Sequence, residues 1–339
     1  MKYRVTFQPA NTVIAVDAEE TILQSALNAG HALPYSCRGG TCGACLAEVV
    51  AGNMAYPDGE RPLALSEQQE AEGKALLCQA YACSDLIIKA REIDDLAGVH
   101  ARVLPCRVLR LQRLAPDVMG IDLRLPAHQR LAFLAGQYID ILWQQGRRRS
   151  FSLADSPHAD EHLALHVRYV PGGKFSHFVF NELQEGAILR FQGPLGTFFL
   201  RRDSERPIIM LGGGTGFAPL KAMLEEAFHQ GLDRSVHLYW GARTRQDLYL
   251  HALPLRWAEQ QPQFRYTPVL SAPAADDHWD GRCGWVHAAV AEDYPDLSHA
   301  DVYMSGPPAM IAAAKTAFFA QGLPPEQLFY DSFDWAKDG

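Results

Sequence analysis

The sequence contains no apolar run of the roughly 18 residues that are needed to cross a bilayer. It has no basic excess either, because 31 Lys and Arg residues stand against 39 Asp and Glu residues, a formal charge of −8. This balance disfavours a general role in nucleic-acid binding. The first residues, Met1–Phe7, alternate like a strand and lack the apolar core of a signal peptide. We therefore expect a cytoplasmic protein that binds neither nucleic acid nor membranes. We also expect a monomer.

Internal repeats and low-complexity tracts are also lacking. The composition, 48% hydrophobic and 21% charged, is that of an ordinary globular protein, and 339 residues are enough for two or three domains. The pattern of strands and helices divides the chain into three blocks, residues 1–95, 103–203 and 204–339. Between the first two, the acidic pair Asp94–Asp95 and the following Ala97–Gly98 predict a linker.

The first block is rich in short strands. Alternating residues predict strands near Tyr3–Phe7 and Thr12–Val16, and a helix follows over Thr21–Ala29, with Gly30 as its stop. The second block has evenly spaced short strands, which predict a small antiparallel barrel. These strands are expected at Arg107–Leu111, Val118–Leu125, Gln137–Trp143, Leu163–Val170 and Ala187–Gln192.

The third block changes to continuous apolar strands that alternate with helices. This pattern predicts a doubly wound parallel sheet, because strands that are buried on both faces need not alternate. The expected strands are Ile208–Leu211, Val236–Trp240, Phe264–Leu270, Val302–Met304 and Leu328–Tyr330.

Seven cysteines, an odd number, are not spread like a disulfide framework. Cys37, Cys42 and Cys45 have the spacing C-x4-C-x2-C, and Cys78 follows after 32 intervening residues. This is the plant-type ferredoxin spacing for a [2Fe–2S] cluster. Gly39, Gly40 and Gly43 allow the tight loop in which amide groups approach the sulfur atoms.

Two other interpretations of the cysteines stay open. A structural zinc site would show two short C-x2–4-C pairs, and a set of buried structural thiols would need no metal at all. The four positions together with the glycines favour the iron–sulfur interpretation. We expect the remaining Cys83, Cys106 and Cys283 to be small buried hydrophobic side chains.

The segment Arg149-Ser150-Phe151-Ser152 resembles the flavin motif R-x-Y-[ST] of the ferredoxin–NADP reductase superfamily. The resemblance implies that Arg149 pairs with the flavin phosphate, that Phe151 stacks near the isoalloxazine, and that Ser152 acts catalytically by a hydrogen bond near flavin N5. Phenylalanine in place of tyrosine keeps the stacking and loses a phenolic hydrogen bond. Taken alone, the basic triplet Arg147–Arg149 would be a solvated loop.

A second segment, His166 to Ser176, resembles the phosphate turn G-G-x-x-[ST] of the same superfamily. A helix N-terminus and free amides suit a pyrophosphate. The resemblance implies flavin contacts at His166, Val167, Gly172, Gly173, Lys174 and Ser176.

A glycine turn directly follows the predicted strand Ile208–Leu211 and opens a helix, which is the context that phosphate binding requires. It lacks the Lys of a Walker loop and matches the superfamily's nicotinamide motif G-G-G-T-G-x-x-P. A tight turn without ligand is the plain alternative. The cofactor-binding candidates are Gly213, Gly214, Thr215, Gly216 and Pro219.

Met304–Met310 is similar to the superfamily's C-G-P-P-x-M segment, with Ser305 in the cysteine position and Gly306 and Pro307 after it. The resemblance places Ser305 beside the nicotinamide C4 and flavin N5; the alternative is a plain turn residue. Near the C-terminus, the segment Phe329–Trp335 resembles the tail that places an aromatic over the flavin. We select Phe333, for which an ordinary core aromatic is the alternative.

The adenosine ribose is expected near Tyr239–Arg243 and Asp247–Tyr249. Arg243 and Arg245 would favour the 2′-phosphate of NADPH, whereas Asp247 would favour the free ribose of NADH. The arrangement is more similar to that of NADH-using relatives.

Together these segments resemble reductases with an N-terminal plant-type ferredoxin domain. The resemblance implies a multidomain α+β and α/β fold: a β-grasp-like ferredoxin domain, a β-barrel flavin domain and a doubly wound nicotinamide domain. It implies electron flow from NADH to FAD to [2Fe–2S] to a protein acceptor, which we expect to be an oxygenase component. A reductase of the CDP-6-deoxy-3,4-glucoseen type, serving a nucleotide-sugar dehydrase, is the second hypothesis, and a redox sensor without turnover is the third.

Overall fold

The computed structural model describes residues 1–96, 99–159 and 162–333. The chain forms two compact units: the first is Met1–His100 with Gly196–Phe198, and the second is Ala101–Leu195 with Phe199–Gly339. Part of the expected linker, Ala97–Gly98, lies outside the described residues. None of the described helices has the length and apolar character that crossing a membrane requires.

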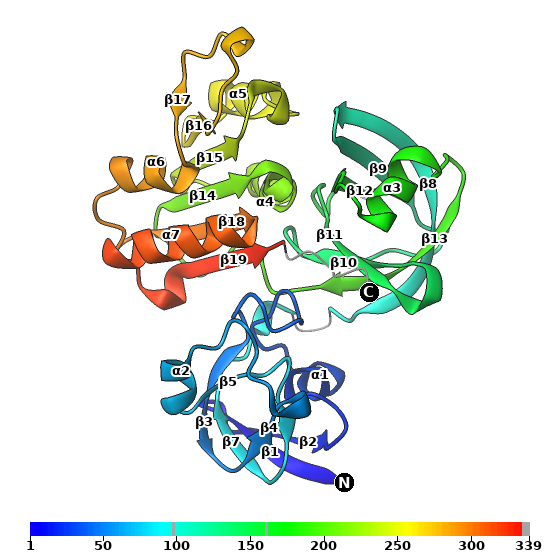
Figure 1. The fold of residues 1–339 in the computed structure, drawn as a ribbon, viewed down its shortest axis with the longest axis vertical. Helices are drawn as coiled ribbons and strands as arrows, with labels where there is room; N and C mark the ends of the chain where they lie inside the picture. The colour runs from blue at the N-terminus through cyan, green and yellow to red at the C-terminus, as the bar shows by residue number, and fades with distance from the viewer. Residues whose placement is uncertain (97–98, 160–161, 334–339) are drawn as a thin grey trace. The chain divides into compact units, whose positions relative to one another are not determined.

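The first unit is built on a mixed five-stranded sheet with the strand order β2-β1-β7-β3-β5 (Figure 1). Only β1 and β7 are parallel neighbours. Strands β4 and β6 form a separate, antiparallel two-stranded sheet. The strands are β1 (Lys2–Gln8), β2 (Thr12–Asp17), β3 (Leu46–Ala51), β4 (Met54–Ala55), β5 (Lys74–Leu76), β6 (Tyr81–Ala82) and β7 (Leu86–Lys89).

The helix of this unit, α1 (Ile22–Asn28), begins and ends as the sequence predicts. The hydroxyl of Thr21 accepts a hydrogen bond from the amide of Gln24 at 3.2 Å, and Gly30 follows the last turn with a φ of 87°. The helix buries Ile22, Leu23 and Ala26 in the core that lies against the sheet. A second short helix is α2 (Glu67–Ala71). This mixed sheet with a packed helix confirms the β-grasp-like expectation.

In the second unit, six antiparallel strands form a sheet with the order β11-β10-β13-β8-β9-β12. A bridge between Leu153 and Leu165 joins its two edges, so the sheet closes into the expected barrel. A helix, α3 (Lys174–Asn181), packs against it. The strands are β8 (Arg102–Ala115), β9 (Val118–Arg124), β10 (Tyr138–Leu142), β11 (Arg148–Ser152), β12 (Leu163–Arg168) and β13 (Ile188–Leu195).

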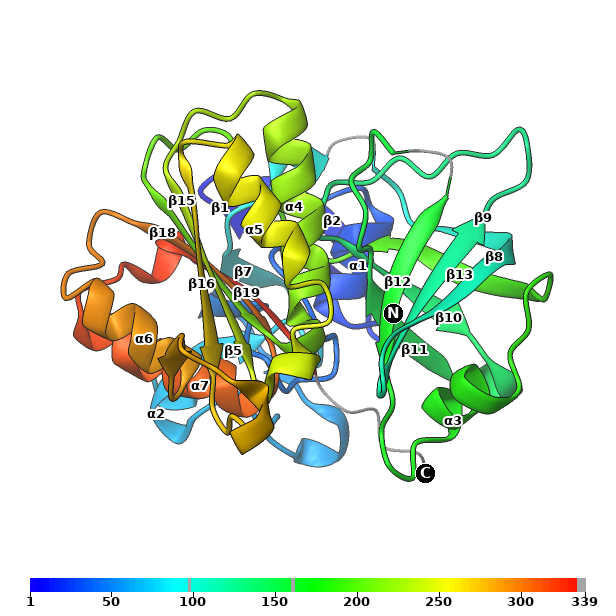
Figure 2. The ribbon, with the colours of Figure 1, turned by 90° about the horizontal axis from the view of Figure 1, so that it is seen from above.

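The rest of the second unit is a six-stranded, all-parallel sheet with the order β17-β16-β15-β14-β18-β19. Figure 2 shows helices α4 and α5 on one face and α6 and α7 on the other, as the sequence predicts for a doubly wound sheet. The strands are β14 (Ile208–Gly213), β15 (Val236–Ala242), β16 (Phe264–Leu270), β17 (Arg282–Cys283), β18 (Asp301–Gly306) and β19 (Leu328–Ser332); the helices are α4 (Phe217–His229), α5 (Ala252–Gln260), α6 (Val286–Asp293) and α7 (Pro308–Ala320).

The strand order of this sheet reverses at β14, which has β15 on one side and β18 on the other. In open parallel sheets, ligands bind outside the carboxyl ends of the strands at such a switch point. β14 ends in Gly213 and β18 in Gly306, so the fold brings two of the predicted segments together there.

Two of the three expected buried thiols are not buried. Cys106 lies in the barrel core, but Cys83 and Cys283 are exposed, so the expectation for these two is wrong. Cys283 ends β17, an edge strand that pairs only with β16, and Cys83 follows the two-residue strand β6. Both side chains are left exposed at these positions.

Candidate functional site

The predicted cluster ligands lie at the ends of two paired strands. β3 begins directly after Cys45, β5 ends two residues before Cys78, and Leu46 pairs with Leu76 across the two strands. The amide of Leu77 donates to the carbonyl oxygen of Cys45 at 3.2 Å. This register brings Cys78 to the cysteine loop although the two are far apart in the sequence.

The four thiols meet as two pairs, Cys37 with Cys42 and Cys45 with Cys78, each joined by a side-chain hydrogen bond. The hydrogen bond with Cys42 lowers the pKa of Cys37 to about 4, whereas that with Cys78 raises the pKa of Cys45. In the described part of the chain, no three His, Cys, Asp or Glu side chains are arranged to hold a metal ion. Two thiols for each of two irons are what a binuclear centre requires, so the pairing fits a [2Fe–2S] cluster.

The loop that carries the first three thiols is shaped by left-handed backbone. Gly40 and Gly43 have φ values of 75° and 81°, as their residue type predicts, and Arg38 also has a positive φ of 55°. The amide of Gly39 donates to the sulfur of Cys37 at 3.3 Å. The loop thus directs a backbone donor at a ligand sulfur, an interaction that tunes a cluster.

The predicted flavin motif lies on β11, so the basic triplet is not merely a solvated loop. Ser150 donates from its hydroxyl to Oδ1 of Asp140 at 2.6 Å on the neighbouring strand. The ring of Phe151 packs on Phe175 with centroids 5.4 Å apart. Burial and the nearby Arg147 lower the pKa of Arg149.

Ser152, at the end of β11, reaches across to the parallel sheet. Its hydroxyl donates to Oδ2 of Asp331 at 3.1 Å, and both side chains are buried. Asp331 in turn is the register partner of Ser305 on the adjacent strand. The structure therefore brings together two of the three predicted catalytic residues, and Asp331 is a neighbour that sequence reasoning missed.

Ser305 is fully buried, and its hydroxyl has no hydrogen-bond partner among the described residues. A buried hydroxyl without a partner is costly, so a ligand group at this point would stabilise it. The third predicted catalytic residue, Phe333, is half-buried and donates from its amide to the carbonyl oxygen of Gly306 at 2.9 Å. Trp335, in the same segment, lies outside the described residues.

The predicted phosphate turn precedes α3. Gly172 has a φ of 78°, and the hydroxyl of Ser176 holds the turn by bonding Val170 and Gly173 rather than pointing outward. Beside the turn lies a cavity of about 430 Å³, large enough for part of a dinucleotide. Its lining residues are Trp143, Gln144, Tyr169, Gly172, Gly173, Lys174, His177, Phe178 and Glu182.

His166 and Val167 lie on β12, which leads to this turn. Burial lowers the pKa of His166 to about 3, so its ring is neutral, and Nδ1 lies 2.9 Å from the hydroxyl of Tyr249. The side chain of Val167 is 1% exposed in the barrel core. Only the backbone of Val167 is thus available for a flavin contact.

The glycine turn after β14 is packed more tightly than a phosphate site alone requires. A Cβ atom at Gly216 would lie 2.0 Å from the carbonyl oxygen of Ser305, and one at Gly213 would lie 2.6 Å from the sulfur of Met310. Thr215 lies in the one-turn 3-10 helix Gly214–Gly216, and Pro219 in the first turn of α4. The close approach of β18 and α7 therefore dictates glycine here as well.

Arg168 faces this turn from the barrel. Its Nη1 would lie 2.8 Å from a Cβ atom at Gly214, while Nη2 is buried without a hydrogen-bond partner among the described residues. Nε lies 3.2 Å from a carboxylate oxygen of Asp117. A guanidinium whose buried Nη2 has no hydrogen-bond partner among the described residues, beside backbone amides, fits a bound pyrophosphate, which takes both kinds of donor.

Two of the residues predicted at the ribose, Asp247 and Arg245, have other partners. Oδ2 of Asp247 accepts from both the amide and the hydroxyl of Thr244 at 3.0 Å, so it caps its own helical turn. Arg245 donates to Asp277. Arg243 is exposed after β15. Its role and that of Asp247 at the ribose stay predictions.

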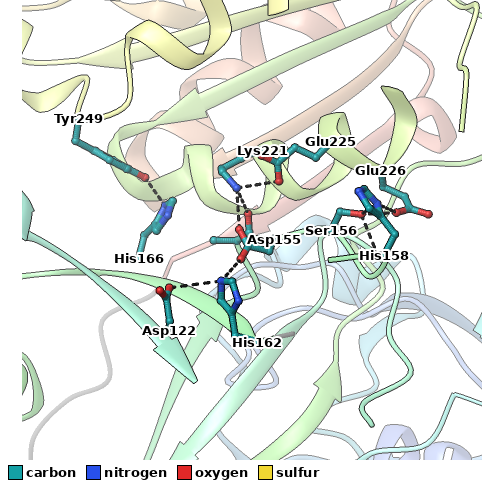
Figure 3. A network of polar contacts seen from close by, with 11 residues as sticks. Asp122, Asp155, Ser156, His158, His162, His166, Lys221, Glu225, Glu226 and Tyr249 are labelled. Atoms are coloured by element: carbon teal, nitrogen blue, oxygen red, sulfur yellow. Dashed lines mark hydrogen bonds and ion pairs between the residues drawn. The ribbon is translucent and has the colours of Figure 1, made fainter. Parts of the chain in front are cut away.

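A polar network joins the barrel to the parallel sheet (Figure 3). Nζ of Lys221, on α4, lies 2.8 Å from both Asp155 and Glu225, and His162 lies 3.2 Å from Asp155. Burial by itself lowers the pKa of Lys221, but the two carboxylates raise it overall. The amine is therefore charged, and it connects α4 with the turn that follows the flavin strand.

Comparison with known proteins identifies all three parts of the chain. Residues 5–83 match the family described as a 2Fe-2S iron-sulfur cluster binding domain, residues 105–200 an oxidoreductase FAD-binding domain, and residues 210–316 an oxidoreductase NAD-binding domain. The chain therefore belongs to the family of iron–sulfur flavoprotein reductases that join a plant-type ferredoxin domain to a ferredoxin–NADP reductase fold.

Relatives and a solved structure cover nearly the whole chain. The CDP-6-deoxy-L-threo-D-glycero-4-hexulose-3-dehydrase reductase of Yersinia pestis is 38% identical over 98% of this chain and 99% of its own. Reductase component 2 of the terephthalate 1,2-dioxygenase of a Comamonas species is 34% identical over 100% and 99%. The crystal structure of the Amycolatopsis cytochrome P450 reductase GcoB has 33% identity and a TM-score of 0.80, with 98% of each chain covered.

These matches establish the chemistry of the chain. It is an oxidoreductase that binds a [2Fe–2S] cluster, FAD and NADH, and it transfers electrons from NADH through FAD to the cluster. The relatives are named as reductases, which gives no support to the hypothesis of a sensor without turnover.

Proposed function

We propose that this protein is the reductase component of a multicomponent oxygenase and delivers electrons singly from its cluster to the oxygenase protein. The observation that carries the proposal is the combination, in one chain, of paired cluster thiols with flavin and nicotinamide sites. Bound FAD supplies the exchange between the two-electron chemistry of NADH and the one-electron chemistry of the cluster. A relative of this kind is the Comamonas reductase component.

We assign the residues as follows. Cys37 and Cys42 hold one iron, and Cys45 and Cys78 hold the other. Arg149 and the turn before α3 hold the flavin phosphates, and the glycine turn after β14 holds the nicotinamide dinucleotide. Ser152 and Ser305 face the reacting ends of the two cofactors.

Asp331 accepts the hydrogen bond of Ser152 and so fixes the direction of that hydroxyl. Arg168 supplies charge to the dinucleotide from the barrel side, and its buried Nη2, which has no hydrogen-bond partner among the described residues, supports this role. Both residues extend the set that the motifs predict. We also propose the domain bounds 1–95, 103–203 and 204–339, and a monomeric, cytoplasmic protein that binds no nucleic acid.

A second candidate acceptor is the dehydrase of a nucleotide-sugar pathway. The higher identity to the Yersinia reductase, 38% against 34%, favours it. The genes that adjoin the coding sequence separate the candidates: an oxygenase gene supports the first, and nucleotide-sugar enzymes support the second.

The electron route is tested in the full chain with Cys78→Ser. This variant should lose the cluster and keep FAD, and it should still reduce ferricyanide, which takes electrons directly from a flavin. Its reduction of cytochrome c should fall to a small fraction of the wild-type rate. Equal cytochrome c reduction by both proteins would contradict delivery through the cluster.

A further inference from the structure

Leu63 has the most exposed side chain of all large hydrophobic residues that the structure describes. It is 87% exposed, whereas most leucines of the first unit are buried. It lies in the segment 57–64, between β4 and α2. A single exposed leucine is ordinary, so its surroundings decide whether it has a role.

The segment is held in place at both ends. Tyr56 before it and Leu65 after it are 9% and 2% exposed in the core of the first unit. The hydroxyl of Tyr56 accepts a hydrogen bond from the amide of Leu76 at 3.1 Å, and the amide of Leu65 donates to the carbonyl of Pro62 at 3.0 Å. The backbone on both sides of Leu63 is therefore fixed, and the exposed position of its side chain follows from this fixed backbone.

The residues on both sides of Leu63 contact the cluster loop. The amide of Ala64 donates to the carbonyl oxygen of Gly40 at 3.0 Å, and a Cβ atom at Gly40 would lie 3.0 Å from Cβ of Pro62. Gly40 lies between Cys37 and Cys42 in the sequence. A protein bound at Leu63 would thus lie next to Ala64, which is hydrogen-bonded directly to the loop that holds the cluster.

The charge around Leu63 is negative. Between residues 57 and 70 there are four acidic side chains and one basic side chain, Arg61. Arg61 is already paired, with Glu67 at 3.1 Å and Glu70 at 3.9 Å. Asp58 and Glu60 are exposed and have no ion-pair partner in the described part of the chain. Asp58 and Glu60 thus form an acidic border next to the exposed apolar side chain of Leu63.

We propose that the segment 57–64 is the surface on which the protein electron acceptor docks, with Leu63 as its apolar anchor. The acceptor's matching face is an apolar socket bordered by Lys or Arg side chains. Electron tunnelling slows steeply with distance, so the acceptor has to bind close to the cluster loop. An apolar anchor within a charged border is the usual anatomy of a protein interface. The inference rests on the proposed function, in which the cluster passes electrons to a separate protein.

Cytochrome c, a basic one-electron haem protein, is the probe for this surface. In the full-length protein, Leu63→Ser should slow NADH-driven reduction of cytochrome c by about fivefold or more, the effect of losing an anchor residue. Glu60→Lys should also slow it and should flatten its dependence on salt, because a border charge acts on the association rate. The matched control is Val13→Ser: Val13 is 55% exposed on β2, the sheet edge opposite β5, and its loss should change nothing.

Two further measurements separate docking from the internal route. Reduction of ferricyanide and bleaching of the cluster by NADH in a stopped-flow instrument should be unchanged in Leu63→Ser. A slower bleaching would overturn the proposal, because the segment would then serve the chain's own electron transfer. An unchanged cytochrome c rate in Leu63→Ser, or an equal loss in Val13→Ser, would overturn it too.

The proposed function and the docking surface can be tested separately. If NADH never bleaches the wild-type cluster, electrons do not reach it and the proposed function is wrong. The same variants are then mixed with cytochrome c after reduction by dithionite, which loads the cluster directly. An unchanged rate of cluster oxidation in Leu63→Ser would overturn the docking surface by itself, and a fivefold loss would support it.

Discussion

Replacing Lys221 by methionine tests the network that joins α4 to the barrel. The Lys221 side chain is 10% exposed, and Nζ lies 2.8 Å from Asp155, 2.8 Å from Glu225 and 3.0 Å from the carbonyl oxygen of Ala154. Methionine keeps much of the length of the side chain and removes the charge. The carboxylates of Asp155 and Glu225 would then lose the lysine cation that they share.

The expected loss follows from the burial of the partners. Removing one member of a fully buried ion pair costs about 3–5 kcal/mol. Asp155 is 18% exposed and Glu225 is 26% exposed, so water screens part of the effect, and we expect about 2–3 kcal/mol. For a unit of this size each kcal/mol lowers Tm by about 2–4 °C, which gives a loss of about 4–12 °C.

The assay is the temperature at which the full-length protein releases FAD, followed by flavin fluorescence. Glu225→Gln is the matched control. Burial raises the pKa of Glu225, so its charge is already unfavourable there, and Gln should stay within about 2 °C of the wild type. A loss under 2 °C for Lys221→Met, or an equal loss for Glu225→Gln, would refute the reasoning.

The loss of stability in Lys221→Met should also depend on pH. Without Lys221, which lowers the pKa of Glu225, that pKa rises further above its ordinary value. A carboxyl whose folded-state pKa is raised binds its proton more tightly in the folded protein, so stability falls as pH rises through that pKa. The loss in Lys221→Met should therefore be largest at neutral pH and should shrink on acidification. Flavin reduction by NADH should slow as well, because the two halves of its site are joined less firmly.

Two further predictions concern the metal centre and a buried histidine. Cys37→Ser should remove the iron found by elemental analysis, whereas Cys283→Ser, an exposed edge position, should keep two irons per chain. Burial lowers the pKa of His166 from 6.5 to about 3, so the folded protein resists its protonation and loses stability as pH falls through this range. His166→Gln should lose less stability than the wild type when urea midpoints at pH 7 and pH 5 are compared, and an equal loss would contradict the neutral ring.

The sequence predicts the strands well where burial alternates or is continuous, and less well where pairing alone makes a strand. β8 extends over Arg102–Ala115, although the pattern predicts only Arg107–Leu111. One end pairs with β13 and the other with β9, so hydrogen bonds to two neighbours extend it in both directions. For the same reason β11 is a strand despite its arginines, because β10 pairs along its whole length.

The site shows a similar division. The motifs predict the loops, because a cluster or a pyrophosphate demands glycine and cysteine at fixed spacings. They do not predict Asp331, which meets Ser152 across 179 residues of sequence. Arg168 lies within the segment His166 to Ser176 but has no assigned role there, and Lys221 belongs to none of the motifs. The role of each residue becomes visible only where the barrel packs against the parallel sheet. The only local signal is Lys221 itself, a charge within the apolar run of α4.

The identity of the acceptor is a different kind of problem. A reductase of a dehydrase and a reductase of an oxygenase are both similar to this chain, at 38% and 34% identity over nearly its full length, so overall similarity does not separate the two acceptors. Exposed positions such as those in the segment 57–64 can change with little cost in stability, because substitutions on the surface leave packing intact. The charge and the apolar area of this segment can therefore differ between reductases that serve different acceptors, while the path of the electrons inside the protein stays the same. Specificity for an acceptor should therefore depend on a few surface residues near the cluster loop rather than on the overall identity between two chains.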